Sequence, residues 1–129
     1  MKKQKMTKSS EDYLEAILVT HRKKGVCHSI DVATHLGVSK PSVTVAMANL
    51  EQMGLIHKEA AGKALTLTPE GLRRASCVLE RHEFLAEVLC RLGVPREVAE
   101  EDACKIEHDL SQTSFDRMRQ WYSEHQDGE

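Results

Sequence analysis

The three prolines of this chain mark the places where helices begin. Pro41, Pro69 and Pro95 each stand at the start of an amphipathic pattern, a position that tolerates the missing backbone N–H. Ser39 and Thr68 precede two of these prolines closely enough to cap a helix. Glycines stand where the patterns stop, at Gly25, Gly37, Gly54 and Gly93. These signals predict six helices, over residues 9–24, 29–36, 40–53, 69–91, 95–109 and 112–125.

A β-hairpin is expected between the third and fourth helices. Residues 55–59 and 64–68 are short, partly alternating segments on either side of Ala61-Gly62-Lys63. The predicted fold class is therefore mainly α. With 129 residues, 40% of them hydrophobic, the chain has room for one compact domain or for two small lobes, and excludes a large enzyme scaffold.

The sequence also bears on the cellular location of the protein, through its lack of long apolar segments. No apolar run is longer than four residues, and Met1 is followed by lysines instead of an apolar segment. We therefore expect neither a membrane span nor a secretory signal, and place the protein in the cytoplasm. The four cysteines lie far apart without a C-x-x-C pair, which suits reduced thiols.

Residues 29–53 have the order of a helix-turn-helix motif. A short helix is followed by Gly37, which can take a left-handed turn, and then by a second helix. Ala33 is small enough to let the two helices cross closely. A buried stripe is expected at Val38, Val43, Met47 and Leu50. Together with the hairpin, this order predicts a winged helix, against the alternative of an ordinary helical hairpin with a solvated polar face.

The outward side of the second helix is the candidate DNA-binding surface. Short hydroxyls and a lysine near a helix N-terminus can meet phosphates and base edges, and the lysines of the hairpin can reach the neighbouring backbone. The predicted residues are Ser39, Lys40, Pro41, Ser42, Thr44, Lys58 and Lys63. The charge agrees, because residues 1–71 carry ten Lys and Arg against seven Asp and Glu, while residues 72–129 carry eight against thirteen.

A metal site is indicated by residues of three predicted helices. Cys104, Glu107 and His108 fall within an arc of roughly 100° on one helix face. His82 occupies a position in an apolar seam of the fourth helix. Two carboxylates lie three residues apart on the first helix, at Asp12 and Glu15. Each residue alone has a structural explanation, but the set of thiolate, imidazole and carboxylate groups suits a divalent first-row metal.

The other cysteines and histidines are expected to have no such role. The cysteines Cys27, Cys77 and Cys90 lack neighbouring ligands and are predicted to pack. Surface positions are expected for His21, His28, His35, His57 and His125.

The last helix carries the signal for self-association. Three of the five aromatic residues, Phe115, Trp121 and Tyr122, lie there together with Met118. We interpret this helix as part of a homodimer interface, against the alternative that it only closes its own core.

Several segments resemble the metal-dependent repressors that include the diphtheria toxin repressor and the manganese transport regulator. They are EDYLEAI at 11–17, the winged helix at about 29–68, LTPEG at 67–71, RHEFL at 81–85 and EDACKIEHDLS at 101–111. The resemblance covers nearly the whole chain and implies a homodimeric, metal-activated transcription factor. It implies a winged-helix DNA-binding domain at 1–71 and a helical dimerisation and metal-binding domain at 72–129.

The resemblance also assigns ligands. All of the candidates above fall on ligand positions of the family: Asp12, Glu15, His82, Cys104, Glu107 and His108. The two carboxylates of the first helix resemble the manganese branch, whereas Cys104 resembles the iron branch. At the ancillary site of the iron branch this chain has Ala86 and Glu100, and Glu100 or Glu101 is a possible further ligand.

The expected ion is Fe(II) or Mn(II), with Zn(II), Co(II) and Ni(II) able to bind in vitro. The chain resembles the short form of the family, which has no SH3-like domain. The regulated genes are expected to be those of metal homeostasis, with repression as the output.

Two other functions are compatible with some of these features. A metallohydrolase could use the same ligands to activate water, but no general base or substrate-binding group accompanies them. A winged-helix regulator could instead respond to an organic ligand or a partner protein, with the polar cluster serving only as structure. Unchanged DNA affinity after chelation would favour that alternative.

Overall fold

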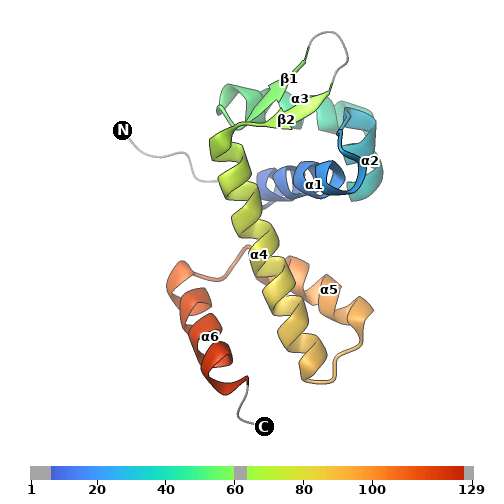
Figure 1. Ribbon diagram of the computed structural model, residues 1–129. Helices are drawn as coiled ribbons and strands as arrows, with labels where there is room; N and C mark the ends of the chain where they lie inside the picture. The colour runs from blue at the N-terminus through green and yellow to red at the C-terminus, as the bar shows by residue number, and fades with distance from the viewer. Residues whose placement is uncertain (1–6, 60–63, 127–129) are drawn as a thin grey trace. The chain divides into compact units, whose positions relative to one another are not determined.

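The computed structural model describes residues 7–59 and 64–126, and the chain divides into two compact units, residues 1–77 and 78–129. The mainly α fold class is correct: the described residues form six helices and one two-stranded sheet (Figure 1). None of the helices in the described part of the chain combines the length and the apolar character needed to cross a membrane.

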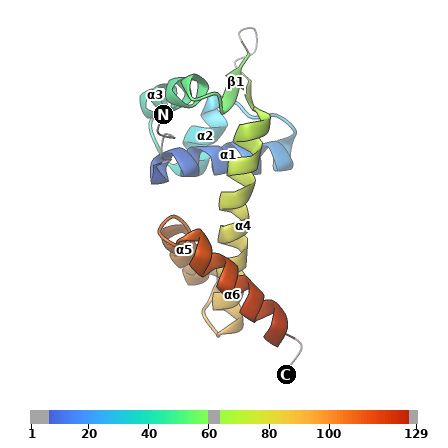
Figure 2. The same cartoon turned by 90° about the vertical axis from the view of Figure 1, so that its left-hand side faces the viewer.

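The first unit contains three helices and the hairpin, which lie together in both views (Figures 1 and 2). The helices are α1 (Lys8–Lys24), α2 (Ser29–Leu36) and α3 (Lys40–Gln52). Their apolar faces meet in a shared core that includes Leu14, Ile17, Val32, Val43, Met47 and Leu50. Burial of these side chains, at roughly 1.5–3 kcal/mol each, is the main driving force for this packing.

The helix-turn-helix motif forms as predicted. Gly37 ends α2 with φ 67°, a left-handed conformation that other residues rarely adopt. Ser39 caps α3, because its side chain accepts a hydrogen bond from the Ser42 N–H at 3.3 Å. These two local signals bring the chain from α2 into α3.

The hairpin consists of β1 (Ile56–Lys58) and β2 (Leu65–Leu67). The strands pair antiparallel, with Ile56 opposite Leu67 and Lys58 opposite Leu65. Ile56 and Leu65 are buried, whereas Lys58 is exposed at the end of β1. Lys63, the other lysine predicted for the wing, lies outside the described residues.

Helix α4 (Pro69–Arg91) starts in close contact with the segment before the hairpin. Thr68 caps it, since the Thr68 side chain accepts from the Gly71 N–H at 3.0 Å and donates to the Gly54 carbonyl at 2.8 Å. A Cβ at Gly71 would stand 1.9 Å from the Leu55 carbonyl oxygen, so only glycine fits at this approach. The LTPEG segment therefore begins α4 and also brings the backbone of Gly71 against the backbone of Leu55.

The second unit contains the rest of α4, α5 (Arg96–Ile106) and α6 (Gln112–His125). Leu85 and Ala86 of α4 pack with Ala103 of α5, and Phe84 and Leu110 cover this cluster. The small alanines allow the two helices to approach closely.

Helix α6 packs against α4 through its aromatic residues. Phe84 contacts the rings of Phe115 and Tyr122 edge-on, with each pair of centroids 5.5 Å apart. Phe115 is therefore buried within its own unit, whereas Trp121 is 59% exposed. Phe115 thus helps to close the core of its own unit, as in the alternative considered for this helix, while Trp121 is left exposed. The interpretation of the helix as part of a homodimer interface stays a prediction.

Three expectations were wrong. Val38 is 36% exposed, because it lies in the turn before the Ser39 cap and outside the periodicity of α3. His21 is half-buried and donates from Nε2 to the Leu65 carbonyl at 3.0 Å, which satisfies a carbonyl of the hairpin. Cys77 is exposed instead of packed.

Helix α5 is also shorter than predicted, since it ends at Ile106 and Glu107 is its C-cap. The remaining helix ends lie within one residue of the expected positions.

The contact at Gly71 can be tested by stability. Gly71→Ala should lower the free energy of unfolding by about 1–3 kcal/mol, because the added methyl group meets backbone that cannot rotate away. Urea denaturation followed by circular dichroism measures this. Ser76→Ala in the same helix is the control and should leave the midpoint nearly unchanged; equal midpoints for the two variants would contradict the close approach.

Candidate metal centre and nucleic-acid interface

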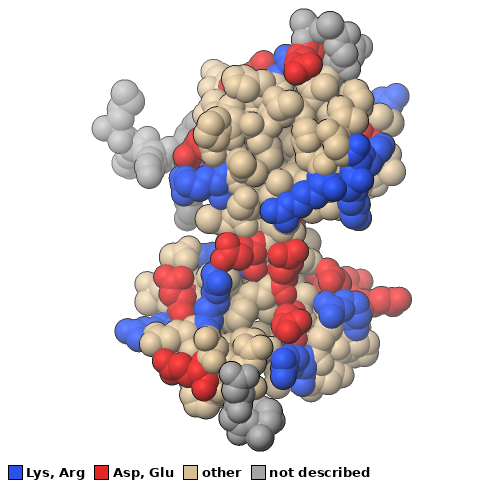
Figure 3. All heavy atoms as spheres, in the orientation of Figure 1, with Lys and Arg blue, Asp and Glu red and all other residues tan. Residues whose placement is uncertain are grey.

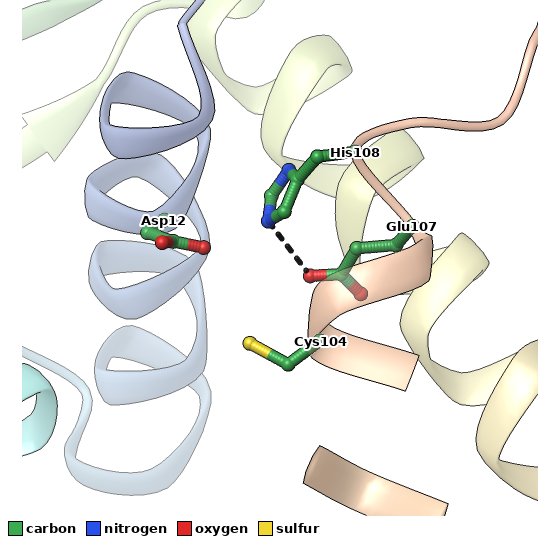
Figure 4. Close-up of side chains that lie close together, drawn as sticks. All are labelled: Asp12, Cys104, Glu107 and His108. Carbon is green, nitrogen blue, oxygen red and sulfur yellow. Dashed lines mark ion pairs between the residues drawn. The ribbon is translucent and has the colours of Figure 1, made fainter. Parts of the chain in front are cut away.

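The centre of the candidate metal site is the carboxylate of Glu107, at the end of α5. Its side chain is fully buried. The Oε2 atom accepts a hydrogen bond from His82 Nδ1 at 3.0 Å. The Oε1 atom lies 3.3 Å from His108 Nε2, but no described residue donates a hydrogen bond to it (Figure 4).

A buried carboxylate oxygen without a donor is costly, and proteins usually offset this cost with a hydrogen bond or a cation. The side chains around Glu107 include groups that can bind a cation. The ligand atoms of Cys104, Glu107 and His108 all lie within 4.8 Å of one another, and the side chains converge at the end of α5 (Figure 4). Sulfur, oxygen and nitrogen donors at these separations fit a divalent transition metal.

The early end of α5 does not disperse these ligands. Glu107 keeps helical angles, with φ −57° and ψ −28°, so that Cys104 and Glu107 remain about one turn apart on one face. Cys104 and Glu107 therefore share one helix face, as predicted, although the regular helix stops at Ile106.

His82 joins the cluster from α4. Its Nδ1 atom faces Glu107, and its Nε2 atom donates to Glu100 Oε1 at 2.6 Å. The pKa of Glu100 is lowered, first by this hydrogen bond from His82 and then by the His82 and Arg96 charges. Within the second unit, the structure thus brings together four of the six predicted ligands.

Asp12 and Glu15, the other two predicted ligands, lie on α1 in the first unit. Both are half-buried and stand three residues apart, so they share one face of that helix. Their participation in a metal site stays a prediction.

Arg81 was missed by the sequence analysis. One guanidinium nitrogen, Nη1, donates to the carbonyls of Glu107 and Leu110 at 3.0 and 2.7 Å, and Nη2 donates to the Gln112 side chain at 3.0 Å. This arginine of α4 therefore holds the turn that carries Glu107 and His108. Its position next to His82 in the chain was the available signal.

Cys27 packs as predicted and belongs to none of the clusters of potential metal ligands among the described residues. It is fully buried, and burial raises the pKa of its thiol to about 11. A thiol with such a pKa stays protonated near neutral pH and binds metal poorly.

The candidate nucleic-acid surface is the exposed start of α3. The side chains of Val43, Met47 and Leu50 face the core. The predicted DNA-binding residues Ser39, Lys40, Pro41, Ser42 and Thr44 are all exposed. The free N–H groups of a helix N-terminus and a nearby lysine attract phosphate. Acidic side chains are abundant on the face of the second unit in Figure 3, which agrees with its negative charge.

The surface borders a hollow that was not predicted from the sequence. A hollow of about 570 Å³ is lined by residues of α3, including Pro41 and Ser42, and by Thr7 and Ser10 at the start of α1. The surface of short hydroxyl side chains is therefore wider than α3 alone. Small polar residues before α1 were the only signal in the sequence.

A winged helix followed by a helical unit with a cluster of potential metal ligands is the architecture expected of a metal-responsive DNA-binding regulator. Residues 5–64 match the model of the iron-dependent repressor N-terminal DNA-binding domain. Residues 68–126 match the model of the iron-dependent repressor metal-binding and dimerisation domain. The chain belongs to the iron-dependent repressor family.

Individual relatives of the chain support the same family membership. The chain is 36% identical over 115 residues to the transcriptional regulator MntR of Escherichia coli O6:H1, covering 89% of this chain and 74% of the relative. It is also similar to the solved structure of IdeR from T. acidophilum, with a TM-score of 0.78, 28% identity and coverage of 94% of this chain and 56% of that one.

A manganese-dependent transcriptional repressor solved with manganese is similar too, with a TM-score of 0.75, 26% identity and coverage of 84% and 50%. The chain thus spans about half the length of these two structures. The family and these relatives are transcriptional regulators and not enzymes, which sets aside the metallohydrolase alternative.

The sulfur ligand can be detected directly. Titration of the full chain with Co(II) should produce an intense near-ultraviolet band from the thiolate, because the sulfur of Cys104 lies within 4.8 Å of the other donors. The band should disappear in Cys104→Ala and remain in Cys77→Ala. A band that persists without Cys104 would show that another thiol binds the metal.

Proposed function

We propose that this chain is a metal-activated, DNA-binding repressor of metal-homeostasis genes that acts as a homodimer in the cytoplasm. The observation that carries this proposal is the fully buried Glu107 carboxylate, with His82 and His108 on its two oxygens and Cys104 beside it. Membership in the iron-dependent repressor family supports it. Residues 1–71 would form the DNA-binding domain and residues 72–129 the dimerisation and metal-binding domain.

The proposed ligands are the six predicted from the sequence, with Asp12 and Glu15 joining His82, Cys104, Glu107 and His108. The bound ion supplies positive charge that lets these anionic groups share one site. Three carboxylates that otherwise repel one another would then hold α1 of the first unit and α5 of the second in one arrangement. The proposed result is a fixed separation of the two α3 helices of a dimer, matched to successive major grooves.

The ion is proposed to be Fe(II) or Mn(II). Carboxylate oxygens favour manganese, and one similar solved structure is a manganese-dependent transcriptional repressor in complex with manganese. The Cys104 thiolate favours a softer ion and supports iron. The two ions can be ranked by the concentration of each that produces DNA binding under anaerobic conditions.

For the homodimer, we propose a surface on the second unit that includes Trp121, Met118 and Leu92. These side chains are 59%, 38% and 75% exposed. Exposed large apolar side chains of this kind are enriched at the centre of protein interfaces. Phe115 would pack against Phe84 in the core of its own unit and would not contact the second copy.

Metal dependence is the first test. Anisotropy with DNA from upstream of the chain's own gene and of neighbouring transporter genes should show binding that is about five- to 150-fold tighter with Fe(II) or Mn(II) than with EDTA. Glu107→Ala and His108→Ala should remain folded dimers by sedimentation and lose the metal effect. Glu101→Ala is the control that should keep it, because Glu101 is exposed and belongs to no cluster of potential ligands among the described residues. Equal DNA affinity of the wild type with EDTA would favour the organic-ligand alternative.

The role of α3 is tested by salt dependence. Lys40→Ala should weaken binding to all DNA sequences to a similar degree and lower the slope of log K against log salt by about one. Lys24→Ala is a matched control, because Lys24 forms an ion pair with Asp31 at 2.7 Å on α2. An unchanged slope for Lys40→Ala would remove this residue from the DNA contact.

A further inference from the structure

The imidazole of His82 is held between two carboxylates of one helix. Glu107 Oε2 lies 3.0 Å from Nδ1, and Glu100 Oε1 lies 2.6 Å from Nε2. Both carboxylates belong to α5 or its C-cap, whereas His82 comes from α4. The ring is therefore fixed at both nitrogens by groups of the neighbouring helix.

The spacing along α5 explains this geometry. Glu100 and Glu107 are seven residues apart, which is about two helical turns, so they lie on the same face. Their environments differ. The Glu107 side chain is fully buried, whereas the Glu100 side chain is 46% exposed, and its second oxygen lies 3.5 Å from Arg96 Nη1.

The exposed position of Glu100 argues against a role as a core residue. Its carboxylate points one oxygen at His82 and the other at a solvent-exposed arginine. No group of three or more potential ligands that includes Glu100 occurs among the described residues, so a second metal site of its own is not indicated.

We propose that Glu100 is a positioning residue that prepares His82 as a metal ligand. Glu100 accepts from the Nε2–H and fixes the orientation of the ring, so that Nδ1, which donates to Glu107 when no ion is bound, is the nitrogen that gives up its proton and binds the proposed ion. Histidines that bind metals almost always donate their other N–H to a carboxylate, a carbonyl or water, and this partner also makes the ring a stronger ligand. The inference rests on the proposed function, since it takes His82 as a ligand.

The chain offers a matched pair of variants on α5. Glu100→Gln and Glu101→Gln each remove one negative charge, but only position 100 contacts His82. Glu100→Ala removes the acceptor as well, whereas the amide oxygen of Glu100→Gln can still accept. Affinity for Mn(II), measured on the full chain from the electron paramagnetic resonance signal of the free ion, should fall at least about 10-fold in Glu100→Ala. It should fall less in Glu100→Gln and stay unchanged in Glu101→Gln.

A double-mutant cycle shows whether Glu100 acts through His82. In a His82→Ala background, the further change Glu100→Ala should have no effect on Mn(II) affinity. An effect that persists without His82 would make Glu100 a ligand in its own right and overturn the proposal. Equal affinities of Glu100→Ala and the wild type would overturn it too.

Nitrogen NMR gives a readout that is independent of affinity. With diamagnetic Zn(II) bound, the ¹H–¹⁵N spectrum of the labelled histidines should show His82 coordinated through Nδ1 and protonated at Nε2. This pattern should remain in Glu101→Gln and weaken or change in Glu100→Ala. Coordination through Nε2 in the wild type would contradict the inference.

Titration of the wild-type chain with metal distinguishes a failure of the proposed function from a failure of the inference on Glu100. If the wild-type chain binds neither Mn(II) nor Zn(II), the proposed function and this inference fail together. If it binds them and the Glu100 variants behave like the Glu101 control, only the inference fails.

Discussion

The second unit depends on the way that the end of α5 is held by α4. The buried side chain of Glu107 takes a hydrogen bond from His82, and its main-chain carbonyl takes one from Arg81. Two adjacent residues of α4 therefore bind both ends of the same glutamate. Because Arg81 also reaches Leu110 and Gln112, the start of α6 is fixed by the same contacts. The arrangement of three helices thus converges on one charged residue that would be costly to bury alone.

The hydrogen bonding of Glu107 is incomplete, so the cluster is not explained by a role in stability alone. Hydrogen bonds to His82 satisfy only one oxygen of Glu107, and the second oxygen keeps an ion-pair distance to His108 without a hydrogen bond among the described residues. A cluster built only for stability would be expected to satisfy both oxygens. The incomplete satisfaction, together with a nearby thiol, is the feature that connects this fold to metal binding.

Much of the first unit was predictable because its signals are local. A serine cap, a left-handed glycine and a proline at the start of a helix act on neighbouring backbone atoms, and Ser39, Gly37 and Pro69 all behave as expected. Predictions failed where a residue left the helical pattern. Val38 lies one residue before the cap and is exposed, and His21 is recruited by a hairpin carbonyl that is 44 residues away in the sequence.

The helices, the winged-helix order and the types of ligand available could be predicted from the sequence, because backbone hydrogen bonding and capping depend on near neighbours. It also placed Cys104, Glu107 and His108 together, since they lie within about one turn. The packing of the folded chain was needed to show that Glu100 contacts the second nitrogen of His82, that Arg81 holds the turn with Glu107 and His108, and that Phe115 belongs to the core. Those outcomes depend on how two helices pack, and packing is set by the shapes of side chains that are distant in the sequence.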